Sequence, residues 1–216
     1  MSADAKKSLV IVEGKSEFSV LPKLCEKHGL SVNFEIKSEK SISQLKQAIP
    51  VYLKNTQLYR RLWIIADADK CADNVWTAIK NLLLKSSKYN FRTNMPLPAG
   101  GAVIKPIDPE DITVGVWIMP DNAAPGMLED FILGCIRPTD TLIGKAIDAV
   151  NELDSERHKH PNIFRPTHKS KACVHTWLAW NHKPVESLAT AIEKGLLDLN
   201  NPTCQKFIQW LAGLNK

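Results

Sequence analysis

The sequence predicts an α/β fold, in which a mostly parallel β-sheet carries helices on both faces and a short helical extension follows at the C-terminus. Short apolar runs rich in β-branched residues alternate along the chain with longer segments whose apolar residues recur at helical spacing. This alternation is typical of parallel strands joined by crossover helices. With 216 residues, 44% of them hydrophobic, the chain is also long enough to bury one sizeable core.

The first half of the chain contains three strand-like runs, each followed by a helix-like segment. The strands are expected at residues 8–12, 32–36 and 62–66, and the helices at residues 16–28, 41–53 and 73–84. Ser16 can cap the first helix, because a serine side chain accepts a hydrogen bond from the first turn, and Ser41 opens the second. Gly29 ends the first helix, as a glycine after the last turn commonly does.

The second half contains one further strand and several helices. Residues 88–101 are polar, with two prolines and a glycine pair, and predict an exposed loop or hairpin region. A strand is expected at 113–119, helices at 126–135 and 139–153, an ambiguous basic connection at 154–171 and two or three short helices within 174–214. We therefore expect an α/β core over residues 1–153. Residues 154–216 should pack on that core and complete one compact unit.

The composition argues against several classes of protein. Charged residues make up 24% of the chain, close to the average of folded proteins, so disorder is not expected. No apolar stretch approaches the roughly 20 residues that cross a bilayer, and the polar N-terminus is unlike a secretory signal. We expect a cytoplasmic protein without a membrane partner. The five cysteines lack the paired spacing of a zinc site or a disulfide framework, and the net charge of +5 permits a polyanionic partner.

Carboxylates follow three of the expected strands directly. Glu13 comes after the first strand, Asp67 and Asp69 after the strand at 62–66, and Asp121 after the strand at 113–119. In an open parallel sheet, the functional site lies beyond the carboxyl ends of the strands, near a switch in strand order. Three separate segments should therefore bring carboxylates to one edge of the sheet.

Crowded carboxylates repel one another unless a cation neutralises them. Their hard oxygen atoms suit Mg²⁺ or Mn²⁺ better than zinc. Glu17 lies four residues after Glu13 at a helix start and can face the same side, and Glu129 and Asp130 lie in another expected helix. This set exceeds the needs of one ion. Two ions about 4 Å apart would suit the in-line cleavage of a phosphodiester. An isolated Asp-x-Asp, by contrast, is usually an ordinary turn.

A nucleotide-binding loop is a competing interpretation of the same region. Gly14-Lys15-Ser16 after a strand looks like the end of a P-loop, and residues 62–67 resemble its partner strand. The P-loop pattern requires a glycine five positions before Gly14, where this chain has Leu9. We therefore reject nucleotide hydrolysis by this chain.

Two motifs resemble those of the Toprim domain, which is shared by primases, topoisomerases, recombination proteins and several nucleases. The first is a strand ending in Glu13-Gly14, and the second is a strand ending in Asp67-Ala68-Asp69. Glu17 resembles the pattern of the OLD (overcoming lysogenization defect) nucleases. The stretches 115–122, 126–130 and 171–180 look like a small family of uncharacterised Toprim proteins related to that group. The resemblance covers about residues 8–213 and implies a standalone, Rossmann-like Toprim protein.

The resemblance also implies roles for individual residues. Glu13, Asp67 and Asp69 match the metal-binding and catalytic motif, and Glu17 and Glu129 resemble ligands of a second metal. Asp121 and Asp130 are weaker matches to metal ligands. Lys171 resembles a lysine that stabilises charge on the scissile phosphate, with Lys169 as the competing choice. OLD proteins carry an ATPase domain that this chain lacks, so any ATP-driven control would require a separate partner.

A basic stretch could bind the phosphate backbone beside the metals, although such charge runs are more often simply solvated. The candidate nucleic-acid-binding residues are Lys15, Arg157, Lys159, Arg165, Lys169 and Lys171. The nearby histidines lack the paired spacing of a zinc site. Trp177 and Trp180 could stack on bases, but their spacing in a helix favours a role in the core.

The sequence thus favours a metal-dependent nuclease that acts on DNA more readily than on RNA. Two alternatives stay open. One is a non-catalytic Toprim module that binds or regulates within a DNA-repair or phage-defence complex, and the other is a ribonuclease of the RNA-maturation type. The sequence does not decide between nicking and double-strand cleavage, nor whether the chain forms a homo-oligomer.

Overall fold

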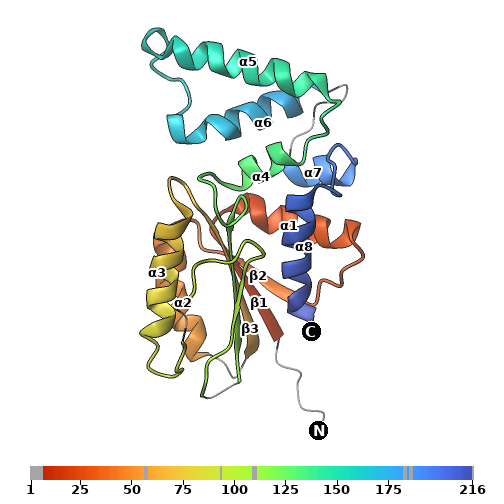
Figure 1. Cartoon of the computed structure of the whole chain (residues 1–216). Helices are drawn as coiled ribbons and strands as arrows, with labels where there is room; N and C mark the ends of the chain where they lie inside the picture. The colour runs from red at the N-terminus through yellow and green to blue at the C-terminus, as the bar shows by residue number, and fades with distance from the viewer. Residues whose placement is uncertain are drawn as a thin grey trace.

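The computed structural model describes residues 7–55, 58–92, 94–108, 111–181, 184 and 187–215, and its centre is a five-stranded sheet (Figure 1). The strand order is β2-β1-β3-β5-β4. Four strands are parallel, and only β4 runs antiparallel, against β5. The bounds are β1 (Lys7–Val12), β2 (Phe34–Ser38), β3 (Tyr59–Asp67), β4 (Ala102–Ile104) and β5 (Thr113–Met119). The predicted α/β class with a mostly parallel sheet is confirmed.

Helices cover both faces of the sheet, as its apolar central strands require. One face carries α2 (Ile42–Lys54) and α3 (Ala72–Leu84), and the other carries α1 (Lys15–Lys27), α7 (Leu188–Glu193) and α8 (Pro202–Leu211) (Figure 1). Alternate residues of β1 enter different cores, Leu9 and Ile11 on the side of α2 and α3, Val10 and Val12 on the other. The second cluster reaches from Val10 to Leu214 and so joins both halves of the chain.

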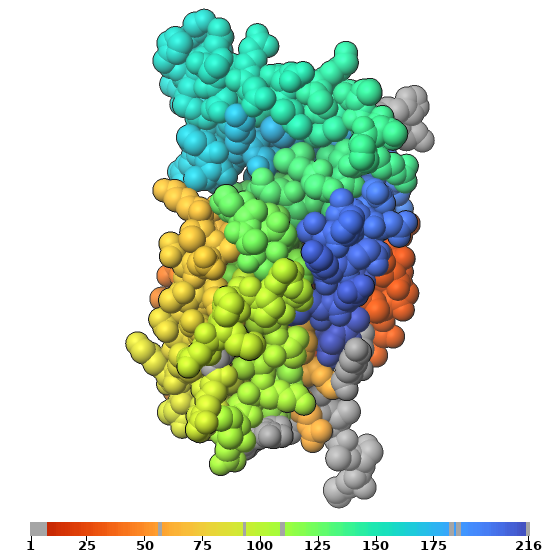
Figure 2. Space-filling view, in the orientation of Figure 1, coloured from red at the N-terminus to blue at the C-terminus, as the bar shows by residue number. Residues whose placement is uncertain are grey.

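A third layer lies beyond the carboxyl ends of the strands. It consists of α4 (Leu128–Gly134), α5 (Thr141–Ser155) and α6 (Lys169–Trp180), and Figure 2 shows α5 and α6 in cyan and light blue at the top. Two short 3₁₀ turns, Arg157–Lys159 and Pro166–His168, connect α5 to α6. The guanidinium of Arg157 donates to Asp154 and, at 2.6 Å, to the carbonyl of Phe164. These bonds tie the connection back onto the end of α5.

Several boundaries differ from the sequence prediction. The second strand, β2, spans residues 34–38 rather than 32–36. Val32 is 43% exposed, so the alternation of apolar residues in the sequence starts two residues before the strand itself. Helix α1 begins at Lys15 with Gly14 as its N-cap, not Ser16, whereas Ser41 caps α2 by accepting from the Gln44 amide at 3.2 Å. The three-residue strand β4 was missed. Within the described residues, no helix is long and apolar enough to span a membrane.

The tail tryptophans divide between core and surface. Trp177 is fully buried and donates from Nε1 to Asp140 at 2.9 Å, which fits the predicted core role. Trp180, three residues later, is 46% exposed, so the prediction of a core role was wrong for this residue. Helix α6 packs against α4 and α5, and Trp177 is buried there whereas Trp180, the last residue of the helix, is not. The three-residue spacing alone could not show this difference.

Candidate functional site

A cavity of about 400 Å³ opens at the carboxyl ends of the parallel strands, where the sequence placed the acidic residues. Strand β1, helix α1, strand β3 and the loop before α4 contribute to its walls, and α6 closes it from the third layer (Figures 1 and 2). Five carboxylates line it: Glu13, Glu17, Asp67, Asp69 and Glu129. Four basic residues line it too: Lys15, Lys40, His168 and Lys171.

The turn after β1 places Glu13 and Glu17 at the cavity. Gly14 lies between the strand and α1, and a Cβ atom at this position would stand 2.6 Å from Oε2 of Glu17. The missing side chain thus lets the Glu17 carboxylate fold back over the strand end. Glu17 is only 3% exposed, which is rare for a carboxylate. A glycine is required here because of close approach, not because of its backbone angles.

The turn after β3 holds the two aspartates in different conformations. Asp69 has a left-handed backbone, with φ of 50°, and exchanges two hydrogen bonds of 2.9 Å with Gly126. Asp67 accepts at Oδ1 from the amide of Leu128, at 3.1 Å. The Asp67 amide in turn donates to Oε2 of Glu13, at 3.4 Å. These bonds hold the ends of β1 and β3 and the start of α4 together.

Glu129, in the first turn of α4, is buried with 3% exposure. Its Oε1 atom lies 3.2 Å from Nζ of Lys171, at ion-pair distance, but the two atoms lack hydrogen-bond geometry. This oxygen therefore accepts no hydrogen bond from the described residues. A buried carboxylate oxygen without a donor is costly unless a cation approaches it.

Burial and mutual repulsion raise the pKa values of three of these acids. Burial contributes most at Glu13, followed in the same direction by the charge of Asp69, while a backbone hydrogen bond from Asp67 opposes the shift. Burial likewise raises the pKa of Glu17, with further contributions from Glu129 and Glu13. The pKa of Asp67 rises to about 9 through burial and then through Glu17, Glu13 and Glu129. The cavity thus holds more negative charge than its surroundings neutralise.

The donor set fits a hard divalent cation. All five acids offer carboxylate oxygens, which Mg²⁺ and Mn²⁺ prefer, and Glu129 presents an oxygen without a hydrogen-bond donor. Across the part of the chain that is described, no three His, Cys, Asp or Glu side chains already form a metal-binding group. The acids therefore share a cavity without converging on one point, as repelling charges do. The metal ligands stay a prediction.

Two of the predicted acids do not line this cavity. Asp121 turns back on its own loop, and its Oδ1 accepts from the amides of Ala123 and Ala124 at 3.0 and 2.7 Å. Asp130 accepts from the Met127 amide at 2.8 Å and from the hydroxyl of Ser170. Asp121 therefore stabilises its own turn, and Asp130 stabilises the start of α4 and the docking of α6 on it.

The predicted basic residues also separate into two groups. Lys15 and Lys171 line the cavity. Three others are held in ion pairs within the α5–α6 connection: Arg157 and Lys169 with Asp154, and Lys159 with Glu156. Arg165 precedes the second 3₁₀ turn as an exposed residue. The ion-paired residues are less available to a phosphate than the sequence suggested.

Two basic residues of the cavity, Lys40 and His168, are not among the predicted site residues. Lys40 follows β2, the neighbour of β1, and has a left-handed backbone with φ of 65°. The rule that located Glu13 and Asp67 could have located Lys40, because β2 ends at the same edge. His168 lies in the basic stretch noted from sequence, directly before α6.

Comparison with known proteins gives one family and one solved structure. The sequence model of the family described as "Protein of unknown function (DUF3226)" matches residues 7–216. Among solved structures, the chain is similar to the C-terminal region of the Burkholderia pseudomallei OLD protein, with a TM-score of 0.40 and 13% sequence identity. That alignment covers 97% of this chain and 88% of the other. No curated protein matches the chain.

Proposed function

Since the chain belongs to the DUF3226 family of proteins of unknown function, its activity has to be inferred from its own side chains, and we propose that it hydrolyses nucleic-acid phosphodiesters with Mg²⁺ or Mn²⁺, DNA being the expected substrate. One observation supports this proposal above the others. Five carboxylates from four segments meet in one cavity, and lysines line the same cavity. Such a set has no evident structural purpose, since it raises pKa values and leaves a buried oxygen without a donor.

The acids would divide between two ions. Glu13, Asp67 and Asp69 follow β1 and β3 and would hold the first, and Glu17 and Glu129 on the two flanking helices would hold the second. Bound divalent ions would supply an activated water and stabilise charge on the attacked phosphate and the leaving oxygen. Gly14 and the Leu128 amide orient the Glu17 and Asp67 carboxylates for this role.

Lys171 would act on the substrate itself. Its ammonium lies 3.2 Å from Glu129 and is 46% exposed, so it faces both the acids and the cavity opening. A cation at this place stabilises the negative charge that builds on the phosphate oxygens during attack. Lys169, the alternative from sequence, pairs with Asp154 at 3.0 Å and does not line the cavity.

Lys15 and Lys40 would contact the phosphate backbone on the side of the sheet. Lys40 also lines a neighbouring groove along α2, of about 440 Å³, so it stands where the two hollows meet. A strand that passes over this point would approach the acids with its charge partly neutralised. This arrangement favours a polymer substrate over a small phosphate ester.

A cleavage assay with the purified full-length chain tests the proposal. Supercoiled plasmid, single-stranded DNA and duplex RNA would each be incubated with Mg²⁺, with Mn²⁺ and with EDTA. We expect metal-dependent cleavage of DNA that Asp67→Asn combined with Asp69→Asn abolishes. The matched control is Asp148→Asn combined with Glu152→Gln, two exposed acids of α5, which should leave cleavage unchanged.

Calorimetric titration with Mn²⁺ separates the competing functions. Metal binding that is lost in the Asp67→Asn, Asp69→Asn variant, without cleavage of any substrate, would favour the non-catalytic module. Cleavage of duplex RNA in preference to DNA would favour the ribonuclease. Cleavage that persists in this variant, or in EDTA, would refute the proposed site.

A further inference from the structure

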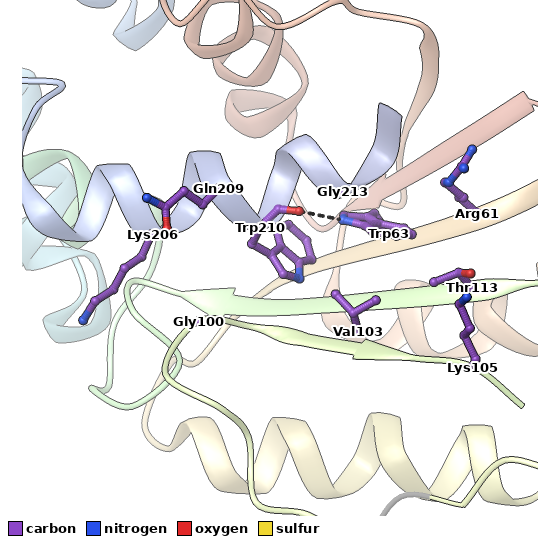
Figure 3. A pocket seen from close by; sticks show the side chains of 10 residues that line it. All are labelled: Arg61, Trp63, Gly100, Val103, Lys105, Thr113, Lys206, Gln209, Trp210 and Gly213. Atoms are coloured by element: carbon purple, nitrogen blue, oxygen red, sulfur yellow. Dashed lines mark hydrogen bonds between the residues drawn. The ribbon is translucent and has the colours of Figure 1, made fainter. Parts of the chain in front are cut away.

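A second cavity, of about 540 Å³, lies at the opposite end of the molecule, near the amino ends of the strands. Figure 3 shows it between the last turns of α8 and the strands β3, β5 and β4. Arg61 is the third residue of β3 and Asp67 is its last, and the six steps along the strand between them correspond to about 20 Å. The two cavities are therefore distinct.

Strand register places three polar side chains of this cavity in one row. Arg61 of β3 pairs with Thr113 of β5, and Lys105 directly follows Ile104, which pairs with Val114. Residues two apart in a strand share a face, so this row lies on the same face as Trp63 and Val103. Figure 3 shows Arg61, Thr113 and Lys105 together at one end of the cavity.

The two cations of this row have no described acidic partner. No ion pair among the described residues involves Arg61 or Lys105. A neighbouring cavity of about 320 Å³ is lined by the same three residues and by Asp111, which stays beyond ion-pair distance of both cations. Like charges that share a row of a sheet repel, and a bound oxyanion between them would reverse this cost.

The rest of the cavity is largely apolar. Both indole N–H groups are already used, that of Trp63 by the carbonyl of Trp210 at 3.5 Å and that of Trp210 by the carbonyl of Ala102 at 3.0 Å. The rings therefore contribute hydrocarbon surface, and Val103 beside them is 53% exposed. At the far end from Arg61, Figure 3 shows Lys206 and Gln209 of α8. The cavity thus combines an oxyanion end, an apolar middle and a polar far end.

We propose that this cavity binds a phosphate monoester of nucleotide size. The phosphate occupies the Arg61–Thr113–Lys105 row, where a guanidinium, a hydroxyl and an ammonium offer donors to its oxygens. The organic part lies against Val103 and the edge of Trp210 and ends near Gln209 and Lys206. The volume lies within the range of small-molecule sites. This site does not depend on the proposed hydrolysis at the other end of the sheet.

Calorimetry on the full-length protein in EDTA tests the site without metal-bridged binding at the carboxylates. The probes are adenosine 5′-monophosphate, adenosine and inorganic phosphate. We expect the monophosphate to bind at least tenfold more tightly than adenosine. Arg61→Gln combined with Lys105→Gln should weaken its binding at least tenfold. The control, Lys85→Gln combined with Lys145→Gln, removes two exposed lysines elsewhere and should change the affinity less than twofold.

A second variant separates the two halves of the cavity. Val103→Trp fills the apolar middle from an exposed position and leaves every charge in place. It should abolish binding of the monophosphate and spare that of inorganic phosphate. Equal affinity for adenosine and its monophosphate, or equal losses in the test and control variants, would overturn the proposal, as would no binding of any probe.

Oligothymidylates with and without a 5′-phosphate then distinguish a free nucleotide from the end of a strand. A gain in affinity from the 5′-phosphate that requires Arg61 and Lys105 would identify a strand end as the ligand. If the phosphate gives no gain, while the monophosphate still binds, the ligand is a free phosphate ester. Both results support the site.

Discussion

The two ends of the sheet carry opposite charges, although strand β3 contributes to both. At the carboxyl ends, acids are enclosed beneath α4 and α6, and two of them, Glu17 and Glu129, are 3% exposed. At the amino ends, Arg61 and Lys105 flank Thr113 on a part of the sheet where α8 stops short. Burial and neighbouring acids raise the pKa values of Glu13, Glu17 and Asp67, whereas the basic side chains at the amino ends are at least partly exposed to solvent. The carboxylate cavity and the cavity beside Arg61 thus differ more in the burial of their charged groups than in the number of those groups.

The largest expected effect tests which lysine acts on the substrate in the carboxylate cavity. Lys171→Ala should lower the rate of cleavage about 10²–10³-fold, because it removes a cation beside the reacting phosphate. Lys169→Ala should lower it less than fivefold, since this lysine pairs with Asp154 outside the cavity. Initial rates at saturating metal measure both. If Lys169→Ala had the larger effect, Lys169 rather than Lys171 would be the lysine that acts on the phosphate.

The glycine that makes room for Glu17 gives the next effect. Gly14→Ala would place a Cβ atom 2.6 Å from the Glu17 carboxylate and force it out of position. We expect Mn²⁺ affinity to fall about 10–100-fold, as for other changes that misorient a ligand. Gly144→Ala, in the interior of α5 with nothing within 4 Å of the new methyl group, is the matched control and should leave affinity unchanged. Calorimetric titration with Mn²⁺ would compare them, and equal affinities would contradict a role for Glu17.

Removing one enclosed charge should stabilise the metal-free protein. The pKa of Asp67 is about 9 in the folded chain, above its ordinary value, so the unfolded chain releases this proton first as the pH rises. Folding therefore loses stability between about pH 4 and pH 9, and Asp67→Asn escapes this loss. We expect its free energy of unfolding at pH 8 in EDTA to exceed that of the wild type by about 1–2 kcal/mol.

Denaturant titrations at pH 5 and pH 8 would measure this difference. It should shrink at pH 5, because the unfolded chain there gains less free energy by releasing the Asp67 proton than it does at pH 8. Saturating Mn²⁺ should reverse the order of stability, because a ligand of the folded state stabilises the wild type more. A variant less stable than the wild type under all three conditions would show that the acids do not strain the metal-free cavity.

The smallest effect separates free basic residues from ion-paired ones. Lys40→Gln should reduce the salt dependence of DNA binding by about 0.9 in the slope of log K against log salt, the value for one phosphate contact. Arg157→Gln should leave the slope unchanged, because its guanidinium is engaged by Asp154 and Phe164. Fluorescence anisotropy in EDTA over a range of salt concentrations measures both slopes. Equal slopes for wild type and Lys40→Gln would exclude that contact.

The sequence could predict features that follow from the order of strands and helices, but not the direction in which each side chain points. Glu13 and Asp67 could be placed at one edge because parallel strands bring their carboxyl ends together, and the hydrogen bond between them shows that proximity. Glu129 could be named from the sequence as an acid of another expected helix, but assigning Lys171 to the site required the resemblance to Toprim proteins. Asp121 follows a strand in the same way as Glu13, but its carboxylate folds into its own turn. Position after a strand does not fix where a side chain points.

Other features depended on packing that no local pattern records. Strand β4 has only three residues, too few to show an alternation. Trp180 is the last residue of α6 and is exposed, although Trp177 three residues earlier is buried. The cavity beside Arg61 exists because α8 ends before it covers the last row of the sheet. Which surfaces stay uncovered depends on how the helices pack in the folded molecule.

The enclosed cavity takes its acids from the sheet layer and α4, but it takes Lys171 from α6 and His168 from the turn before α6. Ser170 donates to Asp130 and links α6 to the first turn of α4, while α5 holds the far side of α6. The proposed catalytic residues thus come from two parts of the molecule, the acids from the sheet layer and α4 and Lys171 from α6. A macromolecule that binds the outer surface of α5 and moves α6 with it would therefore change the distance between Lys171 and the acids.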